Sequence, residues 1–274
     1  MINPNKLKKF IIRLKTLSPV SLSPRESYCF YKGIDDGKVA FESVYSKSKG
    51  INILYPFYQY GEYEQFDPDY AKYYIPGSSL KGSLGGSEEI YVDDIDVKQR
   101  NLDLKIVNKL QYAKLDSKSE RKAMFKPFFE NIGIEMLNPN VEIEATIYSE
   151  NIKIISDLID KQKQLTKKQL EKSIGYIKEM IGRAEAKLKE ELKGNNQQDI
   201  EKWKESIRQL TCFQKKLKLF KEEDVFFLGG YKGEIFSNKE VESTVVDDYQ
   251  GTFYQDDMGN PFGLVEILSI EENV

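Results

Sequence analysis

The sequence predicts an α+β protein in which strands flank a long helical hairpin. Residues 9–15 and 141–148 alternate apolar and polar side chains, which is typical of strands with one buried face. Between residues 165 and 221 the apolar period changes to about 3.6, and Gly194-Asn195-Asn196 interrupts it. This pattern predicts two helices joined by a turn. Strand character returns at residues 225–228.

These changes of pattern divide the chain into three predicted parts. We expect an N-terminal α+β module over residues 1–150 and a helical hairpin insertion over residues 151–222. The C-terminal strands of residues 223–274 are expected to complete the sheet or to form a second small module. A chain of 274 residues can bury a core in one large domain or in two small ones.

The composition excludes several classes of chemistry. The chain has no histidine, which excludes Cys/His zinc sites, histidine acid–base catalysis and Ser-His or Cys-His nucleophiles. Its two cysteines, Cys29 and Cys212, are too few for a disulfide framework. The sequence contains neither a long uncharged apolar stretch nor an apolar signal core at the N-terminus, so we expect a cytoplasmic protein without a membrane partner.

The charges are unevenly distributed along the chain. The net charge is -3, which is not that of a free-standing nucleic-acid-binding domain. Residues 161–221 nevertheless hold 17 Lys and Arg against 8 Asp and Glu, whereas residues 222–274 hold 13 acids against Lys232 and Lys239. This asymmetry predicts one face for a polyanion and another for basic partner subunits. Solvated helix and loop faces are the alternative explanation.

Residues 73–86, YYIPGSSLKGSLGG, predict a strand end, a Pro-Gly turn and a very short helix. A helix N-terminus preceded by glycine offers unpaired N–H groups, and Lys81 adds a full positive charge, so this turn suits a phosphate. A nucleotide-binding P-loop is excluded because Lys81 precedes Gly82 instead of following it. An ordinary strand-to-helix turn remains the alternative.

A second glycine-rich loop occupies residues 229–233, GGYKG. Its glycines would let the backbone approach a ligand closely, with Tyr231 available to stack on a base and Lys232 to meet a phosphate. A loop between strands also needs glycine for its geometry, and this alternative stays open.

Together these motifs resemble a known family. YIPGSSLKGSL resembles the signature of the CRISPR-associated RAMP superfamily, the RNA-binding subunits of type III effector complexes. FIIRLKTLSPVSLSP, FFLGGYKGEIFSN and GNPFGLVEILSI resemble the first strand and its loop, the late glycine-rich loop and the closing strand of that family. The chain departs from the family pattern at Gly85 and Gly86, where the family helix usually continues with an arginine.

The resemblance implies ferredoxin-like, RRM-like modules with the long helical hairpin inserted. It implies a non-catalytic subunit of a Csm-type complex that holds or caps the 3′ end of the guide RNA and assists its maturation. The implied partners are the guide RNA (crRNA), neighbouring RAMP backbone subunits and, as a further class, host nucleases; no cofactor and no metal is expected. The predicted RNA-binding residues are Arg13, Ser21, Gly77, Ser78, Ser79, Lys81, Gly82, Gly229, Gly230, Tyr231, Lys232 and Gly233.

Other functions remain open at this point. A backbone subunit of the same superfamily could cut target RNA with Asp35 or Asp36, although residues 17–24 contain neither the glycine nor the histidine of the family's catalytic loop. A scaffold could use residues 165–221 to bind a protein partner without RNA. The absence of histidine argues against a fourth hypothesis, a guide-processing ribonuclease, without excluding chemistry by tyrosine and lysine. Asp94 and Asp96 could share one side of a strand near a magnesium ion, but no further ligand is identifiable.

Overall fold

The structure is a computed structural model that describes residues 6–23, 28–35, 37–45, 49–61, 63–114, 121–194, 196–233, 236 and 253–273. The sequence pattern predicts a further strand at residues 241–246, followed by the acidic pair Asp247-Asp248, and both lie outside the described residues. In the described part of the chain, no helix combines the length and the apolar character that crossing a membrane requires.

The central strand of the main sheet is β1 (Lys8–Thr16). Its neighbours are β11 (Glu142–Ser149) on one side and the C-terminal β14 (Leu264–Glu272) on the other, both antiparallel. The edges are β5 (Tyr91–Val92) and β12 (Val225–Phe227). Within the described residues the five strands therefore follow the order β12-β14-β1-β11-β5. The C-terminal strand completes the sheet that the N-terminal strand begins.

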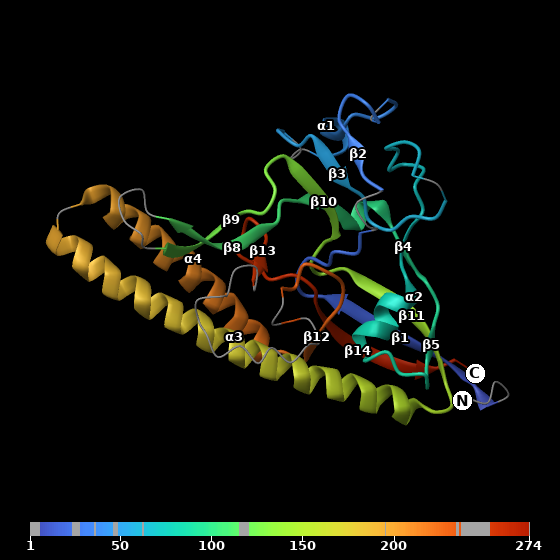
Figure 1. Ribbon diagram of the computed structural model, residues 1–274. Coiled ribbons are helices and arrows are strands. Elements are labelled where there is room, and N and C mark those ends of the chain that lie inside the picture. Colours follow the sequence, from blue (N-terminus) through green and yellow to red (C-terminus); the bar gives the residue numbers. More distant parts are fainter. Residues whose placement is uncertain are drawn as a thin grey trace.

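Two helices cover one face of this sheet, as Figure 1 shows. The alternation of β1 turns its apolar side chains toward α2 (Gly77–Ser83) and the first turns of α3 (Ile152–Gly194). These side chains share one buried cluster with the two helices, which includes Phe10, Ile12, Leu14, Leu80, Leu84, Ile155 and Ile159. The order β1–α2–β5–β11–α3–β14 is the βαββαβ arrangement of a ferredoxin-like module. The predicted α+β class with a long helical insertion is confirmed.

The helical hairpin consists of α3 and α4 (Gln197–Lys221), which lie antiparallel and extend away from the main sheet (Figure 1). The turn falls at the predicted position. The Asn196 side chain accepts a hydrogen bond from the Asp199 backbone N–H, which caps α4. Trp203, expected in the core, is 4% exposed and contacts Ala184 on the facing helix. The first turns of α3 belong to the ferredoxin-like core, because Ile155 and Ile159 pack on the sheet.

A small sheet that the sequence did not predict packs on α4. It consists of β8 (Asn108–Lys114), β9 (Arg121–Pro127) and β13 (Tyr254–Gln255). Ser206 donates to the Ala123 carbonyl, and the Gln209 side-chain oxygen accepts from the Phe125 N–H at 2.9 Å. The sequence pattern does not predict these strands, because the apolar side of the hairpin is short and its other side is rich in lysine.

The remaining strands form two further pairings. In the described residues β2 (Phe30–Tyr31), β3 (Ile53–Tyr55), β10 (Ile132–Leu137) and β7 (Leu102–Lys105) make one sheet, and β4 (Tyr73–Ile75) pairs with β6 (Ile95–Val97). A short helical turn at Gln99–Asn101 links β6 to β7.

Two expectations for this region are wrong. The pattern of residues 27–31 and 38–45 around Gly33 and Gly37 predicts a hairpin. Instead, β2 pairs with β3, and residues 41–44 form a helical turn, α1 (Phe41–Val44). The helical turn places Phe41 and Tyr45, four residues apart, in one buried cluster. Residues 88–97 are not one strand, since Asp93 and Asp94 separate β5 from β6.

Candidate nucleic-acid interface

Three segments that are remote in the sequence meet at the end of β1. The Gly230 N–H donates to the Ser21 carbonyl at 2.8 Å, and the Gly263 N–H donates to the Pro19 carbonyl at 2.8 Å. The Leu228 N–H donates to the Gly263 carbonyl at 2.7 Å. We call this meeting of residues 17–22, 228–233 and 261–264 the junction. It brings together three of the four stretches on which the family resemblance depends.

The junction needs glycine at two positions. Gly229 has φ +87°, and a Cβ there would lie 2.4 Å from the Ser21 carbonyl oxygen. Gly263 also has φ +87°, and its Cβ would lie 2.5 Å from the Leu228 carbonyl oxygen. A side chain at either position would push the two contacting backbone segments apart. For Gly229, the observed role is therefore the close approach of two backbones, which is the geometric alternative considered for this loop.

Tyr231 adopts a left-handed backbone conformation with φ 52°, which non-glycine residues rarely do. Its half-buried ring lies edge-on to the ring of Tyr254, with 6.0 Å between the ring centroids. Gly233, two residues after Tyr231, also has a positive φ, 93°. The loop thus holds the Tyr231 ring in a fixed position next to β13.

Lys232 carries an unusual positive charge. Its ammonium lies 5.8 Å from the centroid of the Phe227 ring, and burial lowers the pKa of Lys232 to about 8. Among the described residues, no carboxylate pairs with this ammonium. Removing an amine from water without a counter-ion makes its charged form less favourable, and a nearby anion would stabilise that charged form. The Lys232 side chain is therefore suited to receive an anion such as a phosphate.

The turn before α2 is built differently from what the sequence predicted. Gly77 is buried, and a Cβ there would lie 2.1 Å from the Val92 carbonyl oxygen. Its N–H donates to the Asp94 carboxylate at 2.8 Å, and the same carboxylate accepts from the Tyr60 hydroxyl at 3.3 Å. A carboxylate of the chain itself therefore lies at the start of α2, where the sequence predicted a phosphate site.

The other predicted residues of this turn remain at the surface. Ser78 and Gly82 are exposed and Ser79 is partly exposed. The Lys81 ammonium lies 5.3 Å from the centroid of the Tyr91 ring on the edge strand β5. The glycine-rich loop of residues 229–233 instead follows β12, which is the opposite edge strand.

Four strand spacings separate these two edges, roughly 19 Å. The two loop motifs predict that both loops lie on one rim of the sheet and present a lysine each to one RNA strand, and their positions on opposite edges show that this prediction is wrong. The sequence could not reveal this, because strand order depends on pairing between distant segments.

Two further predicted contacts are already engaged or covered. Arg13 lies on the open face of the main sheet between Glu144, at 3.5 Å, and Glu271, at 3.9 Å. Ser21 is only 2% exposed, and its carbonyl receives the Gly230 N–H. Ser21 is therefore covered, whereas the Arg13 side chain is 53% exposed and engaged in surface ion pairs. The acidic partners of Arg13 come from β11 and β14, so only strand pairing identifies them.

Two of the four candidate catalytic and metal residues have structural partners. The Asp35 carboxylate accepts from the Tyr31 N–H at 2.8 Å and so closes the turn after β2. Asp36 lies outside the described residues. The Asp94 carboxylate is bound to Gly77 and Tyr60, whereas Asp96 is exposed on β6.

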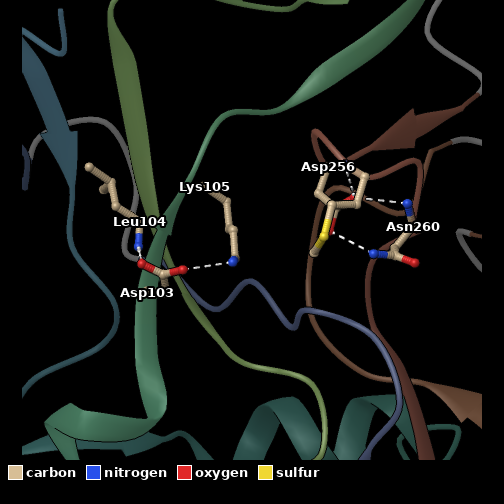
Figure 2. A network of polar contacts seen from close by, with 6 residues as sticks. Asp103, Leu104, Lys105, Asp256 and Asn260 are labelled. Atoms are coloured by element: carbon tan, nitrogen blue, oxygen red, sulfur yellow. Dashed lines mark hydrogen bonds and ion pairs between the residues drawn. The ribbon is translucent and has the colours of Figure 1, made fainter. Parts of the chain in front are cut away.

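Two polar clusters shown in Figure 2 went unrecognised in the sequence. Lys105 on β7 is 7% exposed and pairs with Asp103 at 2.7 Å. Asp256 is 2% exposed, and its carboxylate accepts from the backbone N–H groups of Met258 and Asn260 and from the Asn260 side chain. A pair of loop aspartates such as Asp256-Asp257 predicts a role in solubility, but Asp256 instead holds the loop that leads into the junction.

The solved structures that this chain resembles include chains of two CRISPR complexes. A chain of a Csm–crRNA–target RNA ternary complex of a type III-A CRISPR–Cas system superposes with a TM-score of 0.46 at 10% identity, covering 94% of this chain and 100% of that chain. A chain of a type III-B Cmr-beta complex bound to cognate target RNA superposes with a TM-score of 0.29 at 15% identity, covering 57% of this chain and 52% of the other. No protein-family model and no curated protein matches the sequence.

Proposed function

We propose that this chain is an RNA-binding subunit of a type III CRISPR effector complex and that its junction holds the guide RNA. The observation that carries the proposal is Lys232, a mostly buried ammonium without a carboxylate partner among the described residues, at the meeting point of three motif segments. A sugar-phosphate chain supplies the anion that this lysine lacks.

The sequence motifs and the fold support the same proposal. The motifs that resemble the RAMP superfamily occupy consistent places in a ferredoxin-like module: the first strand, the turn before the first helix, and the loop and strand that close the sheet. Contacts from backbone N–H groups and lysine bind RNA with little dependence on base sequence. Such binding is what a guide-holding subunit requires.

We further propose that the bound segment is the 3′ end of the guide, that neighbouring RAMP backbone subunits are the protein partners, and that the chain itself is not catalytic. In support of the last point, Asp35 closes a turn with its carboxylate. The proposal of a non-catalytic role is contradicted if the purified chain cleaves labelled guide or target RNA in the presence of magnesium and Asp35→Ala abolishes that cleavage.

The RNA proposal is tested with labelled single-stranded RNA at two salt concentrations. We expect Lys232→Met to weaken binding about 10- to 100-fold, because a contact between a charged donor and phosphate is lost. The dependence of log K on log salt should become shallower by about 0.7. Lys72→Met is the matched control, since Lys72 is exposed and, among the described residues, makes no ion pair. Equal RNA binding by wild type and Lys232→Met would overturn the proposal.

Thermal melting shows whether the Lys232 variant is folded. The folded-state pKa of Lys232, about 8, lies below its value of about 10.4 in an unfolded chain. The charged lysine therefore destabilises the fold below pH 8, and this cost declines as the pH rises from 8 to 10.4. We expect Lys232→Met to unfold at a higher temperature than wild type at pH 7, with a gain of up to about 3 kcal/mol. Weaker binding by a more stable variant cannot result from unfolding.

A further inference from the structure

We infer that the outer face of the small sheet next to the junction stacks the bases of single-stranded RNA. This inference rests on the proposed function and extends it from Tyr231 to neighbouring residues with no role so far. The side chains concerned are Phe128, Phe129, Tyr231 and Tyr254, which we call the stacking strip, together with the lysines Lys109 and Lys126.

The rings of the stacking strip form a continuous chain of contacts that starts at the junction. Tyr231 meets Tyr254 edge-on at 6.0 Å, and Tyr254 meets Phe128 edge-on at 5.6 Å. Phe128 contacts Phe129 at 4.1 Å between ring centroids. Phe128, Tyr231 and Tyr254 also pack against a small buried cluster, so core packing explains the positions of these three rings. Phe129 is 44% exposed, and core packing does not explain it.

Two lysines run alongside these rings. On the central strand β8, Lys109 lies directly opposite Tyr254 of β13 on one side and Lys126 of β9 on the other. The three side chains therefore share one face of the small sheet. The other face, with Leu110, Ala123 and Phe125, packs against α4 and its neighbours. The Lys109 ammonium lies 4.7 Å from the Phe128 ring and 6.0 Å from the Tyr254 ring.

The charges on this face favour an anionic ligand. Lys109 and Lys126 are cross-strand neighbours, and like charges in this position repel each other. Among the described residues neither makes an ion pair. A phosphate group between them would remove the repulsion. Rings interleaved with unpaired lysines are the arrangement with which proteins hold single-stranded nucleic acid, the bases on the rings and the backbone on the charges.

A second group of exposed aromatic residues provides a contrast. Tyr60 is 46% exposed and stacks on Tyr74 at 4.1 Å, so its geometry would also suit a base. Its hydroxyl, however, donates a hydrogen bond to Asp94, and Asp93 and Asp96, which neighbour Asp94 in the sequence, are exposed. These carboxylates would repel a phosphate chain. Positive charge therefore distinguishes the stacking strip from the Tyr60–Tyr74 pair.

The inference is tested with RNA that carries 2-aminopurine at successive positions, because stacking on an aromatic ring quenches its fluorescence. We expect quenching at one or more positions with wild type, and its loss at one position with Phe129→Ala. The affinity of Phe129→Ala should fall about 5- to 100-fold. Phe129→Trp keeps an aromatic surface and should restore both signals. Tyr70→Ala, at an 84% exposed tyrosine remote from the strip in sequence, is the matched control and should change neither.

The outcomes separate this inference from the proposed function. If wild type binds RNA and Lys232→Met weakens that binding, but Phe129→Ala changes neither affinity nor quenching, the stacking strip is overturned and the proposed function stands. If Phe129→Ala leaves RNA binding intact and prevents assembly with a partner subunit, the strip is a protein contact and the inference is wrong. If wild type binds no RNA, both proposals fail.

Discussion

At the scale of single residues, Glu135 on β10 shows how a buried carboxylate joins parts of the fold. Its side chain is fully buried and accepts hydrogen bonds from the Tyr45 hydroxyl at 2.9 Å, the Tyr73 hydroxyl at 3.4 Å and the Phe57 N–H at 2.9 Å. These donors come from three different segments. Burial dominates over the hydrogen bonds and raises the pKa of Glu135 to about 7. No local pattern in the sequence identified this residue.

Glu135 makes stability depend on pH near neutrality. Its pKa rises from about 4.3 in the unfolded chain to about 7 in the fold, so the folded state retains the proton at pH values where the unfolded state has lost it. The free energy of unfolding should therefore fall as the pH rises from about 4.5 to 7, by on the order of 3 kcal/mol, and then level off. Urea unfolding at several pH values measures this change.

Glu135→Gln provides the matched comparison for that measurement. Glutamine is neutral and keeps an oxygen acceptor, so the variant should lose this part of the pH dependence and should equal or exceed wild-type stability at pH 8. With no histidine in the chain, few other side chains titrate in the same range. Parallel pH profiles for the two proteins would contradict the assignment.

At the scale of elements, α2 depends on its tertiary contacts. A helix of 7 residues is too short to be stable alone. Leu80 and Leu84 anchor it in the main core, and Gly77 lets its first turn approach the Val92 carbonyl. The Asp94 carboxylate then holds the Gly77 N–H. The same contacts fix both the position of the helix and the exposure of Ser78.

Two glycines in α2 should respond in opposite directions to the same substitution. Gly77→Ala places a Cβ 2.1 Å from the Val92 carbonyl oxygen, which must move, so we expect a loss of about 2 kcal/mol or more. Gly82→Ala meets no atom within 4 Å and should gain up to about 1 kcal/mol from helix propensity. Chemical denaturation of both variants measures the difference. Equal effects would show that close packing at Gly77 does not hold the helix.

At the scale of the whole molecule, the hairpin contributes to separate cores along its length. The first turns of α3 belong to the main core, and its middle packs with α4 and the small sheet through side chains such as Leu170, Ile177, Leu210 and Phe213. Near the tip, Ala184 and Trp203 form a cluster with Leu188 and Ile207 that includes no strand residue. The tip is therefore the part of the hairpin that the two larger cores need least.

Replacing residues 185–204 with a short Gly-Ser linker should leave the rest folded. The main core and the cluster under the small sheet both lie outside the deleted segment, so cooperative thermal unfolding should persist at a somewhat lower temperature. RNA binding should change little, because the junction and the stacking strip are unaltered. If the shortened protein folds and loses RNA binding, the lysines of the tip contribute to the interface.

The sequence by itself determined what depends on neighbouring residues. The change of hydrophobic period, the turn at Gly194–Asn196 and the alternation of β1 and β11 predicted the α+β class and the hairpin correctly, because helix and strand periods are local properties. Tertiary structure alone decided the partners of Arg13, the capping of α2 by Asp94 and the separation of Lys81 from Lys232 on opposite edges. The first and third depend on strand order and register, which are set by contacts between residues more than one hundred positions apart, such as Arg13 and Glu144. The second depends on where the break between β5 and β6 places Asp94 relative to Gly77.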